Sequence, residues 1–504
     1  MRYDLVTYVL GWILLCLGGS MACPLIVAWW YKEPGSAFAF GVSILLVVVV
    51  GWVMTLVKPR EGARGELSPR EGFVIVSGGW MLSGLFGAIP FFLDGTFFTG
   101  QPEEFSLYLA FRSFTDSVFE TVSGFTTTGA SILTDFSRPS HSMFFWRSLT
   151  HWLGGMGIIV LSLAILPVIG VGGMQLFRAE VPGPVKDRLK PKISDTAKTL
   201  WMVYVLISLA EVILLWIGPM DLFEALCHTF GTMATGGFST KGASVGEYNS
   251  SYVNWVITIF MLIAGANFAL HYRFLTGDLK TYFKSEELRV YGIIVIVSLI
   301  LVVGSLQYHH IATDYMVNSL GGHIEHGAFQ VGSILTTTGY CSTDFEQWPH
   351  TARMLLFVLM IIGGCAGSTG GGAKVVRIVL VFKTGYREVL RLIRPKAVYL
   401  VRLDRRPVPE KVVAGVVGFI ILYVGIATFS VLFLSILNMD FVTAMTATAA
   451  SLSNIGPGLE LIGPYDNYAW MPLIAKWWLC FLMILGRLEI YSVLVLLAPS
   501  FWRR

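Results

Sequence analysis

Four short segments rich in glycine and in threonine or serine have residue types suited to holding a dehydrated cation. They are Gly124–Ser131, Thr232–Ser239, Ile334–Cys341 and Leu452–Gly458. A cation that leaves water needs a ring of oxygen atoms, and backbone carbonyls supply them without a fixed negative charge. Glycine adopts most easily the backbone angles that turn successive carbonyls toward one axis. We expect the neighbouring threonine hydroxyls either to add ligands or to support the loops from behind.

The four segments recur at nearly regular intervals along the chain. Aligned on Gly129, Gly237, Gly339 and Gly456, they are 108, 102 and 117 residues apart. Such a period predicts one structural unit per copy. A short helix before each loop would direct its C-terminal carbonyls, which carry about half a negative charge, toward the ion. A single Thr-Thr-Thr-Gly run would indicate only a turn, but four at this spacing predict one cation pore built from four re-entrant loops.

The composition indicates that lipid surrounds the elements that hold these loops. Of the 504 residues, 55% are hydrophobic and 13% charged, whereas soluble domains carry about a quarter charged residues. A helix needs roughly 20 apolar residues to cross a membrane. Candidate spans of that length occupy residues 5–30, 37–57, 72–93, 143–170, 200–218, 252–274, 289–306, 352–382, 412–437 and 470–498. Apolar stretches too short to span, as in re-entrant helices, occupy residues 107–124, 221–233, 322–335 and 440–452.

The connections between the spans differ in charge. Lysine and arginine concentrate in residues 58–70, 171–198 and 383–411, while the connections on the other side contain only Arg112, Arg138 and Lys241. Basic loops stay on the cytoplasmic side, so this distribution places both termini inside, as ten crossings require. The amphipathic run at residues 387–394 is either a solvated interfacial helix or a docking surface for a cytosolic partner.

The predicted fold is an all-α membrane protein with about ten transmembrane helices. Four helix–re-entrant loop–helix repeats would take a pseudo-fourfold arrangement, preceded by two extra N-terminal helices. The predicted boundaries are 1–70 for the N-terminal extension, 71–198 for the first repeat with its cytoplasmic loop, 199–287 for the second, 288–396 for the third with an intramembrane loop, and 397–504 for the fourth.

That intramembrane loop is predicted from a second glycine-rich stretch, in the middle of the span 352–382. Each glycine costs a helix about 1 kcal/mol relative to alanine, so the helix should open here on the cytoplasmic side of the filter. Close helix packing through small residues is the alternative, whereas a phosphate-binding loop would need a Gly-Lys-Ser/Thr ending. The residues concerned are Gly363, Gly364, Gly367, Gly370, Gly371, Gly372 and Lys374.

Charged and metal-binding residue types elsewhere in the chain allow fewer conclusions. Arg487 lies inside the last span, where a charge generally faces a partner or water, and its alternative is an ion pair with Glu489. Glu211 is expected to be a buried hydrogen-bonding group rather than an ion ligand. His323 and His326 are spaced to share a helix face, yet they fall at the mouth-side end of a short helix, and a metal site is not favoured.

Other classes of function are not supported by the residue pattern. The six cysteines have no CxxC pairing, so neither a disulfide framework nor a zinc site is implied. No lysine- or arginine-rich block is interleaved with aromatic residues, which argues against a nucleic-acid partner. A membrane-embedded enzyme would need a nucleophile and a base, and His151 with Ser148 is the nearest approach, without a third partner.

The four loops, their spacing and the segment Ser453–Leu459 resemble the Trk/Ktr/HKT superfamily of cation transporters, and the two extra helices resemble its TrkH/TrkG branch. The resemblance implies potassium translocation as the function, with no tightly bound cofactor. It also implies location in the bacterial inner membrane, a homodimer, and a cytosolic nucleotide-binding subunit similar to TrkA. The intramembrane loop would act as the gate, with Arg487 opposite it.

The same resemblance assigns the ion-lining backbone to three residues of each loop. They are Thr127, Thr128 and Gly129; Thr235, Gly236 and Gly237; Thr337, Thr338 and Gly339; and Asn454, Ile455 and Gly456. Because the loops differ in sequence, the ring would be only quasi-fourfold. Within transport, obligatory coupling to a proton or to sodium is the alternative, and Glu211 is the clearest intramembrane carboxylate for it.

Overall fold

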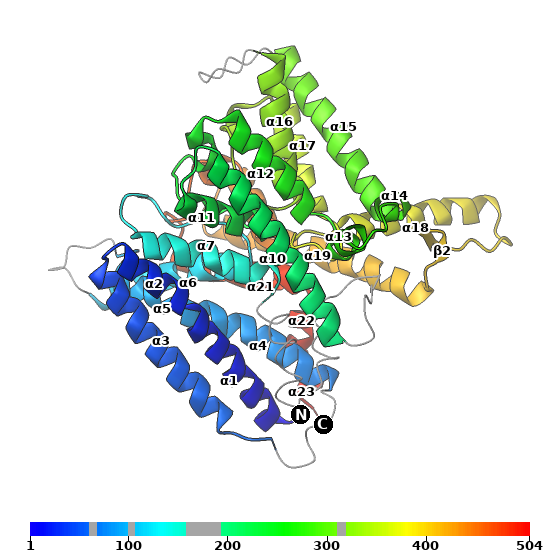
Figure 1. Ribbon diagram of the computed structural model, residues 1–504. Helices are drawn as coiled ribbons and strands as arrows, with labels where there is room; N and C mark the ends of the chain where they lie inside the picture. Colours follow the sequence, from blue (N-terminus) through cyan, green and yellow to red (C-terminus); the bar gives the residue numbers. More distant parts are fainter. Residues whose placement is uncertain (60–67, 99–105, 158–192, 310–318, 504) are drawn as a thin grey trace.

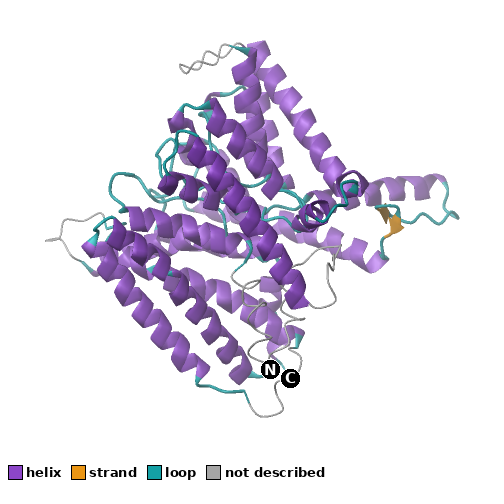
Figure 2. Cartoon of the chain, in the orientation of Figure 1, coloured by secondary structure: helices purple, strands orange, loops and turns teal. Residues whose placement is uncertain are grey.

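The computed structural model describes residues 1–59, 68–98, 106–157, 193–309 and 319–503. Within these ranges the chain consists of helices and connecting loops, with one two-stranded antiparallel hairpin, β1 (Arg402–Leu403) and β2 (Arg406–Pro407) (Figures 1 and 2). The basic segments at 58–70 and 171–198 fall largely outside the described residues.

The N-terminal extension is an antiparallel pair. Helix α1 (Tyr3–Ser20) continues almost directly into α2 (Ala22–Trp30), and α3 (Pro34–Thr55) returns antiparallel beside them. Their backbones approach closely, since a Cβ atom on Gly11 would lie 2.8 Å from the carbonyl oxygen of Gly51. Small residues at a helix crossing permit this contact in a membrane protein.

Four short helices lie where the sequence predicts them, and each begins with a serine or aspartate cap. The caps are Ser106, Asp221, Ser319 and Asp440, whose side chains accept hydrogen bonds from backbone amides of the first turn. The helices are α6 (Leu107–Phe125), α11 (Leu222–Met233), α16 (Leu320–Leu335) and α20 (Phe441–Ser453). A glycine-containing segment follows each helix directly.

A long apolar helix precedes each short one. These helices are α4 (Pro69–Gly87), continued by α5 (Ile89–Asp94), then α10 (Ile193–Ile217), α15 (Glu286–His309) and α19 (Glu410–Ile436). Large exposed apolar side chains, such as Ile296 and Ile300 on α15 at 59% and 64% exposure, suit contact with lipid. In the described part of the chain, six helices can cross a membrane by length and composition, or up to eight when each bent pair counts as one span.

Another set of helices follows the loops, and three of the four are interrupted within the described residues. They are α7 (His141–Gly155), α12 (Ser251–Ala264) with α13 (Phe268–Leu275), α17 (His350–Ile362) with α18 (Val375–Ile393), and α21 (Leu473–Arg487) with α22 (Tyr491–Leu497). The opening expected inside 352–382 is present between α17 and α18. Residues 158–170 of the span 143–170 lie outside the described ranges.

The candidate spans at 252–274 and 470–498 are each broken by a bend that the sequence analysis did not predict. The first bends by 101° between α12 and α13, and the second by 120° between α21 and α22. At the first break the Asn267 side chain caps α13 by accepting from the Ala269 amide at 2.8 Å. At the second, Glu489 and Ile490 adopt positive φ angles of 54° and 61°. These interruptions depend on polar contacts with neighbouring segments, which hydropathy along the chain does not report.

The remaining elements are short. They are η2 (Ser244–Tyr248), α14 (Thr281–Lys284), η3 (Phe345–Gln347), η4 (Glu460–Ile462) and α23 (Pro499–Trp502). Helix α18 and the hairpin project together from one side of the molecule, and the two chain ends lie side by side (Figure 1). Both ends meet the start of α4, where Arg2 pairs with Glu71 at 2.7 Å and Arg70 donates to the Arg503 carbonyl at 3.1 Å.

Candidate functional site: a ring of four loops and the loop beneath it

The four glycine-containing loops share one backbone conformation. Their first residues are left-handed, with φ of 54° at Thr127, 55° at Thr235, 62° at Thr337 and 57° at Asn454. Two residues later each loop has a glycine with positive φ, between 77° and 99°, at Gly129, Gly237, Gly339 and Gly456. Positive φ is uncommon for residues other than glycine, so its occurrence at the same place in all four loops indicates a common geometric requirement.

The four glycines pack against one another's loops in a closed cycle. A Cβ on Gly129 would lie 1.9 Å from the carbonyl oxygen of Gly236, and one on Gly237 would lie 2.1 Å from that of Thr338. On Gly339 it would lie 1.9 Å from the oxygen of Ile455, and on Gly456 it would lie 2.7 Å from the oxygen of Thr128. The first loop therefore contacts the second, the second the third, the third the fourth, and the fourth the first.

Each loop is also tied back to its own short helix in the same way. The amides of Thr128, Gly236, Thr338 and Ile455 donate to helix carbonyls five residues earlier, at 2.8–2.9 Å. These four residues are the ones whose own carbonyl oxygens lie against the glycine of the preceding loop in the cycle. The carbonyl ring is thus held by backbone hydrogen bonds, independently of side-chain identity.

The threonine hydroxyls support the loops rather than only lining them. The hydroxyls of Thr126 and Thr128 are 2.8 Å apart, and those of Thr336 and Thr338 are 2.7 Å apart. Loops two and four lack this pair, because Gly236 and Ile455 replace the second threonine. The Asn454 amide compensates in part by donating to Thr128 Oγ1 at 2.9 Å. The ring is therefore unequal in its side chains.

A cavity of about 380 Å³ opens directly outside the ring and is bounded by all four glycines. Arg147 lies on its wall, buried, with Nε 2.6 Å from Glu120 Oε1 and Nη1 2.8 Å from the Ser239 carbonyl oxygen. Its guanidinium also stacks over the Phe238 ring, 3.6 Å from the centroid. Arg147 therefore fastens the first loop's helix to the second loop.

Lys241 adds a cation at this mouth. It pairs with Glu224 at 2.9 Å. The hydrogen bond that Lys241 donates to Glu224 is the main cause that raises the pKa of Lys241 above its ordinary value, so the ammonium group stays charged at neutral pH.

Two tyrosines brace the ring, and the sequence analysis did not single them out. Tyr340 donates to the carbonyls of His228 and Phe238, both at 3.1 Å, and Tyr468 donates to the Gly456 carbonyl at 2.7 Å. Tyr340 follows a filter glycine directly, as Phe238 does in the previous loop. Aligning the loops could have identified this aromatic position, whereas Tyr468, twelve residues beyond its loop, carries no such signal.

The segment between α17 and α18 lies directly beneath the third and fourth loops. The Gly371 amide donates to Thr337 Oγ1 at 2.7 Å, and a Cβ on Gly371 would lie 2.1 Å from the Ser453 carbonyl oxygen. Gly363, Gly367, Gly372 and Lys374 adopt positive φ. The remaining predicted loop residues, Gly364 and Gly370, lie against Gly265 and Thr336 respectively. We call residues 363–374 the intramembrane loop.

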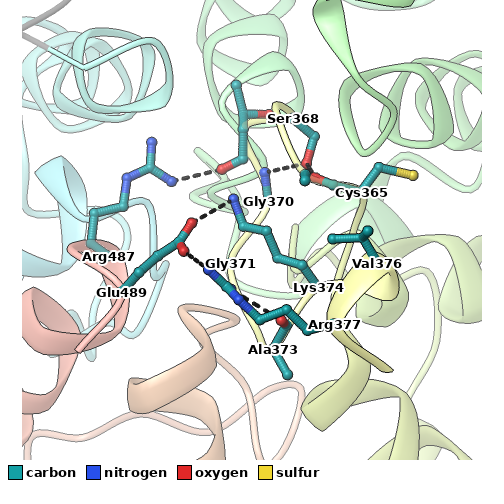
Figure 3. A network of polar contacts seen from close by, with 12 residues as sticks. Cys365, Ser368, Gly370, Gly371, Ala373, Lys374, Val376, Arg377, Arg487 and Glu489 are labelled. Atoms are coloured by element: carbon teal, nitrogen blue, oxygen red, sulfur yellow. Dashed lines mark hydrogen bonds and ion pairs between the residues drawn. The ribbon is translucent and has the colours of Figure 1, made fainter. Parts of the chain in front are cut away.

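Arg487 connects this loop to the ring. It donates to the Thr369 carbonyl at 2.6 Å, to Thr127 Oγ1 at 3.0 Å, and to the carbonyls of Gly154 and Gly155 at 2.6 and 2.8 Å. Glu489 pairs instead with Lys374 at 3.2 Å and with Arg377. Figure 3 shows both side chains reaching from the break between α21 and α22 toward the loop. The structure therefore contradicts an Arg487–Glu489 pair and favours the expected position opposite the glycine-rich loop.

The other candidates from the sequence have structural partners. His323 contacts Gln307 Nε2 at 2.8 Å, and His326 contacts the Ser342 hydroxyl at 2.9 Å. No group of three metal-binding side chains occurs in the described ranges. His151 lies between the Gly124 carbonyl, at 2.8 Å, and the Phe238 amide, at 3.3 Å. Because that amide donates to Nε2, the imidazole donates from Nδ1 and supports the first two loops.

Glu211 is fully buried on α10, and neither carboxylate oxygen has a hydrogen-bond partner among the described residues. The Thr232 side chain lies close enough to interact with this carboxyl group, so the hydrogen-bonding role stays a prediction.

Comparison with known proteins gives one consistent result. The family model of TrkH, a cation transport protein, matches residues 66–504. The chain is 40% identical to the Trk system potassium uptake protein TrkH of Escherichia coli K12 over the full length of both. It is 34% identical to TrkG of the same organism, over 99% of this chain and 98% of that protein. The crystal structure of the potassium transporter TrkH from Vibrio parahaemolyticus, 35% identical, superposes with a TM-score of 0.85 over all of both chains.

Proposed function

This chain belongs to the TrkH family of cation transport proteins, and from this premise we propose that it conducts potassium ions through the ring of four loops. The closed cycle of glycine–carbonyl contacts is the observation that carries the proposal. A ring of carbonyls at one level, one from each loop, can replace the water shell of a cation.

The ion would meet the carbonyls of three residues in each loop. These are Thr127, Thr128 and Gly129; Thr235, Gly236 and Gly237; Thr337, Thr338 and Gly339; and Asn454, Ile455 and Gly456. Four short helices end at these loops, and the negative ends of their dipoles favour a cation there. Potassium is the ion in the names of the relatives, all of which are described as uptake proteins.

The intramembrane loop would act as the gate. It lies against the cytoplasmic end of the ring through Gly371, and Arg487 holds its middle by the Thr369 carbonyl. Displacing this loop requires breaking these bonds and the Lys374–Glu489 pair, so its position can control whether the path below the filter is open. The repeats would follow the boundaries 71–198, 199–287, 288–396 and 397–504, after the extension 1–70.

The membrane setting follows from the same proposal. The basic segments support a cytoplasmic position for both termini and a glycine ring toward the outside of the bacterial inner membrane. The relatives' names refer to a Trk system, which supports a cytosolic nucleotide-binding partner similar to TrkA, and we propose a homodimer. Exposed Arg391 and Arg394 at the end of α18 suit docking of such a partner.

A second candidate, coupling to a proton, is favoured by Glu211. A buried carboxylate without a partner is costly when charged, so this group is suited to carry a proton. The test is the reversal potential of the purified chain in liposomes, measured with a fixed potassium gradient and a varied proton gradient. Channel-like conduction predicts a reversal potential set by potassium alone. A shift with the proton gradient that disappears in Glu211→Gln would replace that mechanism by coupling, and a failure to carry potassium at all would refute both.

A further inference from the structure

A cavity of about 1040 Å³ lies away from the pore. It lies between α13 and α14, the first turn of α15, the β1–β2 hairpin and Ala366 of the intramembrane loop. Helix α18 and the hairpin form the projecting side of the molecule (Figure 1). Neither the filter nor the gate mechanism uses this space.

The cavity wall carries more cations than anions, seven lysine or arginine side chains against four carboxylates. The carboxylates are engaged: Glu286 pairs with Lys383, and Asp278 lies 3.7 Å from Lys284. Asp404 accepts from the Glu286 amide at 2.6 Å. These contacts fasten the hairpin to the start of α15, so the acidic groups build the frame of the cavity.

Three arginines of the hairpin remain available. Arg402, Arg405 and Arg406 are exposed, and within the described ranges their guanidinium groups make no hydrogen bond or ion pair. A guanidinium presents parallel N–H donors that match the oxygens of a phosphate group. The three guanidinium groups belong to one short hairpin and line one cavity. Together they provide enough N–H donors to coordinate a doubly charged phosphate group.

A few exposed apolar side chains lie at or near the cavity. Phe283 on its wall is 80% exposed, and the nearby Leu279 and Leu400 are each 60% exposed. Exposed apolar side chains beside a cluster of arginines are typical of the membrane interface, where headgroup phosphates and acyl chains meet. The site therefore suits a ligand in which an acyl chain accompanies the phosphate group.

The cavity also touches the intramembrane loop through Glu287. Its Oε1 atom accepts from the Ala366 amide at 2.7 Å and from the Val376 amide at 3.2 Å. One carboxylate therefore holds both the loop and the first turn of α18. A ligand on the hairpin would border this contact, since Glu287 and Ala366 both line the cavity.

We propose that this cavity binds a phosphate group through Arg402, Arg405 and Arg406, carried either by an anionic phospholipid headgroup or by a soluble phosphate. The proposal does not rest on the proposed function, because binding can be measured without transport.

The test uses the full-length purified chain in a neutral detergent. Binding of dioctanoyl phosphatidylglycerol, of dioctanoyl phosphatidylcholine and of inorganic phosphate is measured by native mass spectrometry and by titration calorimetry. The variant R402Q/R405Q/R406Q removes the three guanidiniums. The matched control K58Q/K396Q/K411Q removes the same charge from exposed positions that do not line the cavity. Potassium flux in phosphatidylcholine liposomes checks that both variants fold.

We expect the hairpin variant to bind phosphatidylglycerol at least about tenfold more weakly, because charge-assisted hydrogen bonds are lost, with the control unchanged. The same pattern for inorganic phosphate, without phosphatidylglycerol binding, would support the proposal with a soluble ligand. The proposal is overturned if the wild-type chain binds neither probe, if phosphatidylcholine binds equally well, or if the control loses binding as much as the hairpin variant. Should the triple variant not fold, R405Q/R406Q is held to the same comparison.

Discussion

At the scale of single residues, the filter glycines are constrained twice. Gly339 needs a positive φ of 81°, and a side-chain carbon there would also overlap the Ile455 carbonyl oxygen at 1.9 Å. The first constraint costs an L-residue about 1–2 kcal/mol. The second forces the neighbouring carbonyl to move, and that carbonyl is one of the proposed ion ligands. Substitution should therefore alter ion discrimination before it alters folding.

We expect Gly339→Ala to lower the potassium-to-sodium flux ratio by about tenfold, since overpacking of about 1–3 kcal/mol would be relieved by shifting the carbonyl ring. The measurement is flux of each ion into liposomes. Gly425→Ala on α19 is the control, because a Cβ there meets nothing within 4 Å. An unchanged ratio in Gly339→Ala, with normal expression, would contradict the assignment of the filter.

At the scale of elements, the interrupted helices hold the intramembrane loop in position. The breaks after α12, α17 and α21 release backbone groups that bind to one another: the Cys365 amide donates to the Gly265 carbonyl at 2.9 Å, and the Phe268 amide donates to that of Gly367 at 3.0 Å. Irregular backbone at membrane depth is tolerated where its polar groups are satisfied in this way. The intramembrane loop is therefore held by two neighbouring breaks, with Arg487 supplying the link to α21.

Arg487→Gln should loosen the intramembrane loop, because hydrogen bonds to a charged donor contribute about 1.5–3 kcal/mol each. We expect potassium flux of the purified chain to rise about tenfold and amide hydrogen exchange at residues 369–371 to accelerate.

Arg394→Gln, at the exposed end of α18, should change neither quantity. Equal flux and equal exchange in Arg487→Gln and the wild-type chain would show that this side chain does not hold the gate.

At the scale of the whole molecule, the ring must close between the last repeat and the first. A buried ion pair makes this junction: Lys476 on α21 lies 2.6 Å from Asp116 on α6, with 1% and 4% of their side chains exposed. Lys476 also donates to the Ala469 carbonyl at 3.0 Å. The pair joins positions 360 residues apart, so it couples the last repeat to the first where they lie side by side in the ring.

Removing one partner should be far more damaging than removing both. Asp116→Asn or Lys476→Met alone leaves a buried charge unpaired, which costs about 3–5 kcal/mol, whereas the double variant should recover part of that loss. Thermal unfolding followed by fluorescence-detected size exclusion measures the order of stabilities.

Arg138→Gln, which breaks an exposed pair with Asp135, should leave the unfolding temperature nearly unchanged, since exposed pairs contribute about 0–1 kcal/mol. Additive losses in the Asp116/Lys476 double variant would argue against a direct coupling of the pair.

The amino-acid sequence by itself determined the short helices, the loop positions, the opening at residues 363–374 and the membrane-protein class. These features are local along the chain: a span needs a length of apolar residues, and a loop needs glycine where φ is positive. The caps at Ser106, Asp221, Ser319 and Asp440 were equally local.

Only the tertiary structure decided which groups meet across the pore. The cycle of glycine–carbonyl contacts, the bond from Arg147 to the Ser239 carbonyl, the Lys476–Asp116 pair and the partners of Arg487 join residues from different repeats. The bends of 101° between α12 and α13 and of 120° between α21 and α22 were likewise decided by the tertiary structure. The spacing of the motifs along the chain predicts the unit that repeats. The contacts that close four units into a ring depend on how the polar backbone groups of each unit are paired with groups of the next unit, and sequence spacing does not contain that information.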